Sequence, residues 1–312
     1  MIRILEPLDY SEKSLILYRQ IGDVSFGPAL DIDEQCKVLV VRINYYLDRS
    51  LLANYPNLKL IVSPTTGCNH YDINYLRLAK IKVFNLKNVP DKLASIKSTT
   101  EHTLMLAIAI NRNIGLLMHD YRINGPRLVS TRDLYRGNEL STKRLGILGF
   151  GRIGSQLFEM AIPIWKDVLT WDIDPLKIQN LPAKYRARGP KELFRSSDTV
   201  CLCINYSPSN LNFVNKSVLD QLHEKACVVN TSRGEVLDEH EIINRFESNA
   251  FGGYATDVIS DELAIKNHLV IQSLDKPFNI LYTPHIGGCT LDAMHFTEEI
   301  MAEYVFSFFK CT

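Results

Sequence analysis

The stretch Leu145–Asp172, LGILGFGRIGSQLFEMAIPIWKDVLTWD, joins an apolar run to a glycine-rich turn. The run Leu145–Leu148 predicts a buried strand, and Gly149, Gly151 and Gly154 follow it with the spacing GxGxxG. In such a turn the first glycine permits the bend, the second lets the backbone approach a pyrophosphate, and the third lets a helix pack closely on the strand. The sequence therefore predicts a dinucleotide site rather than an ordinary glycine-rich loop.

The elements after the turn support this prediction. A helix beginning near Ile153 would offer its free N–H groups to the phosphates, so we count Arg152 and Ile153 among the cofactor-binding residues. A second strand, Asp167–Trp171, ends in Asp172. A carboxylate at that place can accept hydrogen bonds from ribose hydroxyls and repels a 2′-phosphate. We therefore expect NAD as the cofactor, in preference to NADP.

Composition and charge exclude several classes of protein. The chain has 312 residues, enough for two domains, and its 35 basic and 35 acidic residues balance, so nothing indicates nucleic-acid binding. The apolar run Leu104–Ile110 is far too short for a membrane span. Acidic residues come too early for a secretory signal, and seven scattered cysteines suggest free thiols, so we expect a cytoplasmic protein. Cys201 and Cys203 point to opposite faces of a predicted strand, and we expect no metal site.

Residues 1–97 show short strands alternating with helices, the pattern of a small parallel sheet wrapped by helices. The expected strands are Ile2–Leu5, Val38–Val41, Leu58–Val62 and Ile81–Phe84, with helices at Ser11–Gln20 and Arg49–Tyr55. After the third strand comes Ser63–Asp72, where Thr65, Thr66 and Gly67 offer hydroxyl and N–H groups to an anion. A plain strand-to-helix turn explains this segment equally well.

A capping box at Ser98–Glu101 predicts a long helix from about Thr100 to Asn113. This helix is apolar nearly all round, so we expect it to be buried between domains or between subunits. Strands and helices then alternate to about residue 290, and a last helix, Leu291–Phe309, is expected to return to the first domain. The expected elements between are helices Pro190–Arg195 and Asn215–Gln221, and strands Thr199–Ile204, Ala226–Asn230, Tyr254–Thr256 and Ile280–Thr283.

Three charged side chains lie just beyond predicted strands of the second half: Arg233, Glu262 and His285. A parallel sheet gathers its carboxyl-end loops on one edge, where a dinucleotide also binds. Arginine's planar fork matches a substrate carboxylate and can polarise a carbonyl, and histidine is the usual general acid and base near neutral pH. A carboxylate on the second ring nitrogen would orient the imidazole. The set suits hydride transfer between NAD and a 2-hydroxy or 2-oxo acid, although a histidine in such a turn is often structural.

The motifs resemble those of the D-isomer-specific 2-hydroxyacid dehydrogenases, in order and over nearly the whole chain. They are GFGRIG with Asp172, NTSRGE at Asn230–Glu235, TDVISDE at Thr256–Glu262 and TPHIGG at Thr283–Gly288. The resemblance implies an α/β protein with a discontinuous flavodoxin-like substrate domain, residues 1–97 and 291–312, and an inserted Rossmann NAD-binding domain, residues 98–290. It also implies a cleft active site and a homodimer.

The same resemblance assigns roles to individual residues. Arg233, Glu262 and His285 form the catalytic set, Thr231, Arg233 and Asp257 join the glycine loop in holding NAD, and the Thr65–Gly67 loop meets the substrate carboxylate. D-3-phosphoglycerate dehydrogenase is the nearest alternative, but only one basic residue, Arg42, stands in the segment where those enzymes carry several. Formate dehydrogenase fits less well because position 262 is a glutamate. An NAD-sensing corepressor is the alternative from a different class.

Overall fold

The computed structural model describes residues 1–67, 70–126 and 129–310. The chain divides into two compact units, which we describe separately. Met1–Ile96 and Gly288–Thr312 form the first unit, and Lys97–Gly287 form the second. Within the described residues, no helix has both the length and the apolar character needed to cross a bilayer.

The first unit is built on a parallel sheet with the strand order β2-β1-β3-β4-β5, the order of flavodoxin-like sheets. Its strands are β1 (Ile2–Ile4), β2 (Val24–Phe26), β3 (Val38–Val40), β4 (Leu60–Ser63) and β5 (Lys82–Asn85). Four of these were predicted from the sequence. The edge strand β2 was missed, because its three residues are half-buried or exposed and carry no strong apolar signal.

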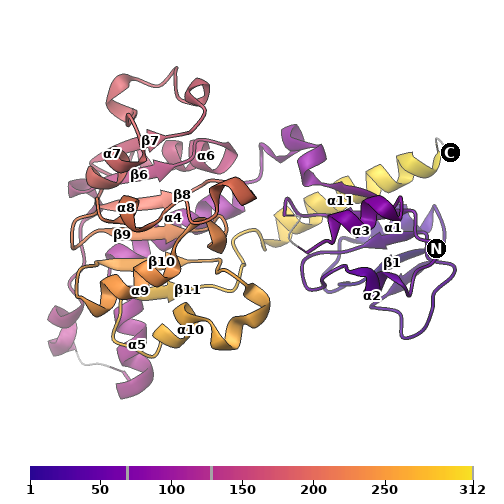
Figure 1. The fold of residues 1–312 in the computed structure, drawn as a ribbon, viewed down its shortest axis with the longest axis horizontal. Helices are drawn as coiled ribbons and strands as arrows, with labels where there is room; N and C mark the ends of the chain where they lie inside the picture. Colours follow the sequence, from indigo (N-terminus) through magenta and orange to yellow (C-terminus); the bar gives the residue numbers. More distant parts are fainter. Residues whose placement is uncertain (68–69, 127–128, 311–312) are drawn as a thin grey trace. The chain divides into compact units, whose positions relative to one another are not determined.

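Helices supply a separate apolar core to each face of this sheet. They are α1 (Glu12–Arg19), α2 (Arg49–Leu52), α3 (Ile73–Leu78) and α11 (Leu291–Lys310). Val62 points to the core that holds Tyr18 of α1 and Val305 of α11, whereas Ile61 points to the opposite core with Leu76 of α3. Figure 1 shows the yellow α11 beside the indigo α1, although the two are far apart in the sequence.

The contact between α1 and α11 is polar as well as apolar. Glu298 of α11 is fully buried, and its Oε2 accepts the backbone N–H of Ser11 at 2.8 Å. Its other oxygen, Oε1, accepts a hydrogen bond from the Arg42 guanidinium. The C-terminal helix is therefore an integral part of the first unit.

The second unit contains a six-stranded parallel sheet with the order β11-β10-β9-β8-β6-β7. Its strands are β6 (Arg144–Leu148), β7 (Asp167–Trp171), β8 (Thr199–Leu202), β9 (Cys227–Asn230), β10 (Gly253–Thr256) and β11 (Ile280–Tyr282). Its helices are α4 (Ser98–Asn111), α5 (Ile114–Asn124), α6 (Arg152–Ala161), α7 (Pro190–Arg195), α8 (Lys216–Leu219), α9 (Glu239–Glu247) and α10 (Leu269–Ser273). This α/β architecture confirms the predicted fold class.

The sheet lies between two helical layers (Figure 1). Leu106 of α4 and Leu157 of α6 share one core with Ile147, while Phe194 of α7 and Ile242 of α9 share the other core with further strand residues. The chain passes from β6 to β7 on one side and then crosses to β8 on the other. The carboxyl end of β6 is thus the point where the connections diverge, the place where such sheets bind ligands.

The predicted capping box at the start of α4 is wrong. The helix already includes Ser98, its N-cap is Lys97, and no side chain caps it. The Thr100 hydroxyl instead donates to Gln156 Oε1 at 2.7 Å, and Thr103 donates to the Thr99 carbonyl at 2.7 Å. The Ser98 hydroxyl, which the sequence pattern made the cap, is buried and has no hydrogen-bond partner among the described residues.

Candidate active site

The glycine turn after β6 has the close approaches that its spacing predicted. Gly149 has φ 96°, and a Cβ there would lie 2.7 Å from the Cys203 carbonyl oxygen. A Cβ on Gly154 would lie 2.0 Å from the Gly149 carbonyl oxygen, whereas one on Gly151 would meet nothing within 4 Å. The first and third glycines are therefore packed against protein backbone, whereas the middle glycine leaves open space in which a phosphate can approach the backbone.

The helix and carboxylate that flank the turn complete a dinucleotide-binding arrangement. No side chain caps the first turn of α6, which begins at Arg152, and burial lowers the pKa of that guanidinium. Asp172 is buried at the end of β7, where its Oδ2 accepts the Phe150 N–H at 2.7 Å and Lys177 Nζ lies 3.3 Å away. A helix N-terminus and a buried acid beside a glycine turn fit the pyrophosphate and ribose of NAD.

The loops after β10 and β11 bring two of the predicted catalytic side chains into contact. Nδ1 of His285 lies 2.9 Å from Oε2 of Glu262, although the residues are 23 positions apart. Both side chains are partly exposed, at 30% and 38%. A carboxylate on Nδ1 is the arrangement that orients an imidazole for acid-base chemistry.

Asp257 holds the backbone of the histidine loop. Its carboxylate accepts the N–H groups of Ile286 at 2.9 Å and Gly287 at 2.8 Å, and the Thr283 hydroxyl at 2.6 Å. The Asp257 carbonyl accepts the N–H of His285. His285 has φ 55°, a left-handed backbone conformation that residues other than glycine rarely adopt. Burial raises the pKa of Asp257, but the hydrogen bond from His102 and those just named outweigh burial, so the pKa is lowered. The carboxylate therefore stabilises an uncommon backbone conformation at His285.

Sequence reasoning missed a further residue of this cluster, His102 of α4. Its Nε2 lies 2.8 Å from Thr283 Oγ1 and 3.3 Å from Asp257 Oδ1. One position along the same helix, Thr103 Oγ1 lies 2.6 Å from Thr231 Oγ1. In the sequence, His102 only stands just before the apolar run that starts at Leu104 and gives no sign of this role. The packing of α4 on the sheet is what shows which helical residues reach the strand ends.

Arg233 lies in the loop after β9, and the bonds of this residue lie within that loop. Its Nη1 donates to the Ser232 carbonyl at 2.6 Å, and the Asn230 amide donates to the Arg233 carbonyl at 2.9 Å. The next residue is Gly234, where a Cβ would lie only 1.9 Å from the backbone nitrogen of Ser260. The arginine loop therefore packs directly on the loop that leads to Glu262.

The threonine loop lies in the first unit, after β4. Thr65 Oγ1 lies 2.9 Å from Ser63 Oγ and 3.3 Å from the Gly67 carbonyl oxygen, and the side chain of Thr66 is exposed. Asp72, which closes the segment, caps α3 by accepting the Tyr75 N–H at 2.9 Å. Cys68 and Asn69 lie outside the described residues. The described part of the segment thus presents Thr66 at the surface ahead of α3.

Residues 104–287 match the sequence profile of the D-isomer specific 2-hydroxyacid dehydrogenase, NAD binding domain. The chain belongs to this family. The match covers more than half of the chain and includes both the glycine turn and the His285 loop. Membership in this NAD-dependent oxidoreductase family, and NAD as its cofactor, are thereby confirmed.

Individual relatives agree with this assignment. The D-3-phosphoglycerate dehydrogenase of Haemophilus influenzae is 30% identical over 290 residues, which are 92% of this chain and 65% of that one. Among solved structures, the fold is similar to that of D-lactate dehydrogenase from Aquifex aeolicus with NAD and lactic acid (TM-score 0.76, 22% identity, 99% and 96% of the two chains). It is also similar to the NAD-dependent formate dehydrogenase of Staphylococcus aureus with NAD (TM-score 0.77, 24% identity, 99% and 96%).

Proposed function

We propose that this 2-hydroxyacid dehydrogenase family member interconverts a D-2-hydroxy acid and its 2-oxo acid, with His285 as the general acid and base. The contact of 2.9 Å between His285 and Glu262 carries the proposal. NAD, when bound, accepts or supplies the hydride. The imidazole gives a proton to the substrate oxygen in the reducing direction and removes it in the oxidising direction.

The remaining residues of the proposal bind and orient. Glu262 fixes the ring of His285 and stabilises its charged form. The Arg233 guanidinium pairs with the substrate carboxylate and polarises the carbonyl, because a planar fork can meet both oxygens at once. Thr65, Thr66 and Gly67 are proposed to contact the same carboxylate. Thr231, Asp257 and the turn Gly149–Gly154 are proposed to hold NAD.

An unphosphorylated acid is the preferred substrate. Arg42 is mostly buried, and its guanidinium donates to the Glu298 carboxylate and to the Leu8 carbonyl, the latter at 3.1 Å. This pairing neutralises the basic residue that stands where phosphoglycerate dehydrogenases carry several. A phosphorylated hydroxy acid is the second candidate, because the Haemophilus relative bears the name D-3-phosphoglycerate dehydrogenase.

The test is a panel of 2-oxo acids added to the protein with saturating NADH, followed at the NADH absorbance. The panel contains pyruvate, branched-chain 2-oxo acids, glyoxylate and 3-phosphohydroxypyruvate. We expect oxidation of NADH with at least one unphosphorylated acid, and turnover confined to the phosphorylated one would favour the second candidate. If no acid is reduced although NADH binds, the dehydrogenase proposal fails and an NAD-sensing role replaces it.

Replacing Asp172 with alanine should weaken the preference for NAD over NADP by about tenfold or more, since the acid that would repel the 2′-phosphate is gone and the Lys177 ammonium beside it remains. The ratio of kcat/KM for NADH to that for NADPH measures this preference. As a matched variant, Lys177→Ala should move the ratio the opposite way. An unchanged ratio in Asp172→Ala would contradict the assignment.

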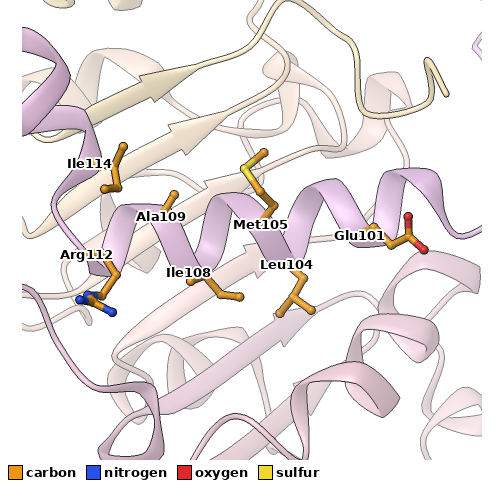
Figure 2. Close-up of a pocket in the computed structure, with 7 residues that line it drawn as sticks. All are labelled: Glu101, Leu104, Met105, Ile108, Ala109, Arg112 and Ile114. Atoms are coloured by element: carbon orange, nitrogen blue, oxygen red, sulfur yellow. The ribbon is translucent and has the colours of Figure 1, made fainter.

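We further propose a homodimer through the outer face of α4. Glu101, Leu104, Met105, Ile108, Ala109, Arg112 and Ile114 line an open hollow of about 640 Å³ along this helix. Figure 2 shows Leu104 and Ile108 projecting together from the side of α4. Met105 is 45% exposed, and Met118 and Tyr121 of α5 are similarly exposed. Exposed apolar side chains along such a hollow are typical of a subunit contact.

Ile108→Glu should convert the dimer to a monomer at micromolar concentrations, because it would bury a charge in that contact without a partner. Sedimentation velocity over a range of concentrations measures the mass. Leu176→Glu is the matched control, since Leu176 is 65% exposed and lies elsewhere in the second unit. A monomeric wild-type chain, or a dimeric Ile108→Glu variant, would contradict this interface.

A further inference from the structure

The loop that carries Glu262 is anchored on a buried carboxyl group that the proposed chemistry does not use. Glu239, the first residue of α9, is 4% exposed. Its Oε2 accepts the Ser260 backbone N–H at 3.1 Å and the Ser260 hydroxyl at 2.6 Å. We propose that Glu239 is a positioning residue: by fixing the backbone at Ser260 it sets the reach of Glu262 to His285. This inference rests on the proposed function.

The anchor includes a third residue, His268. Its Nδ1 accepts the Val270 N–H at 3.3 Å, so a neutral ring carries its proton on Nε2. Nε2 lies 3.1 Å from Ser260 Oγ and 3.2 Å from Glu239 Oε2, and burial lowers the pKa of the ring. Ser260 thus accepts from His268 and donates its single hydroxyl proton to Glu239. This order excludes a hydrolytic triad, in which the carboxylate would meet Nδ1.

Ser260 is the point where two catalytic loops meet. On one side, its backbone nitrogen is the atom that a Cβ on Gly234 would strike, so it supports the loop of Arg233. On the other side, Asp261 has φ 49° and turns the chain sharply before Glu262. A shift of Ser260 would therefore move both loops, and misplacement by about 1 Å can cost a hundredfold in rate.

The role of Glu239 as an acceptor does not depend on its charge. Burial raises its pKa to about 7, although the two hydrogen bonds from Ser260 oppose that rise. Its Oε1 is buried and has no hydrogen-bond partner among the described residues. A glutamine has the same shape and keeps one carbonyl oxygen, so it should still accept both hydrogen bonds from Ser260. An alanine leaves the N–H and hydroxyl of Ser260 without their acceptor.

The test compares Glu239→Ala, Glu239→Gln and Glu247→Ala. Glu247 ends the same helix and is exposed, so it is the matched control. For Glu239→Ala we expect kcat to fall about 10- to 100-fold with KM for NADH within about twofold, in line with the loss of other residues that orient a reacting group. The isotope effect with 4-deuterated NADH should rise, because hydride transfer becomes slower. Glu239→Gln should keep at least about a third of the wild-type kcat.

Equal kcat and isotope effect in Glu239→Ala and Glu247→Ala would overturn the inference, and so would a glutamine variant as impaired as the alanine variant. If Glu239→Ala does not fold, Ser260→Ala replaces it, with an expected loss of about fivefold in kcat. Hydrogen exchange of residues 258–263 gives a readout without substrate: Glu239→Ala should speed it, and Glu239→Gln should not. A wild-type chain that reduces no oxo acid would defeat the proposed function, while the exchange result would still decide whether Glu239 anchors the loop.

Discussion

His285→Ala should lower kcat by roughly 10²- to 10⁴-fold while leaving the affinity for NADH within a few fold. In the proposed mechanism the imidazole exchanges a proton with the substrate oxygen, and its Nδ1 lies 2.9 Å from Oε2 of Glu262. Alanine removes the proton donor but keeps the backbone N–H that bonds to the Asp257 carbonyl. Steady-state rates with the best oxo acid give kcat, and fluorescence titration gives the NADH affinity.

The control for this substitution is His223→Ala. His223 is a partly exposed histidine of the same unit, and its ring lies 3.5 Å from Asp198. It should keep wild-type rates. If His285→Ala lost NADH affinity in the same proportion as kcat, the residue would act in cofactor binding rather than in proton transfer, and the assignment would be wrong.

Arg233→Ala should lower kcat/KM by about a thousandfold, because a charge-assisted two-point contact with the substrate carboxylate is lost in both the bound and the reacting state. Arg233→Lys should recover only part of this, since an ammonium keeps the charge but not the planar fork. Both KM for the oxo acid and kcat should worsen. The measurement is the full dependence of rate on oxo-acid concentration at saturating NADH.

Arg188→Ala provides the comparison, because Arg188 is exposed and pairs locally with Glu192, four positions along the chain. It should be indistinguishable from wild type, as expected for a surface ion pair. A loss in Arg233→Ala confined to NADH affinity would show that the guanidinium serves the cofactor. Full activity in Arg233→Lys would contradict the proposed two-point contact, because a lysine cannot make it.

The elements that could be predicted from sequence are those set by short-range patterns. The strand Asp167–Trp171 and the helix Pro190–Arg195 occur with the expected bounds, because a β-rich run and a proline at the first helical position are local signals. The start of α4 was predicted wrongly for a related reason. The local serine–glutamate pattern favoured a cap at Ser98, but the helix already begins at this residue, and its hydroxyl bonds to none of the described residues.

By itself, the sequence determined the glycine turn with its closing acid, the family motifs and the α/β class, since each can be recognised from residues close together in the chain. Only the tertiary structure decided which side chains meet. His102 reaches Thr283 across 181 positions, and Glu239 reaches Ser260 across 21. Such pairs depend on strand order and helix packing, which bring distant residues to one edge of a sheet. Local sequence periodicity, which reports only the helix and strand repeats, does not predict them.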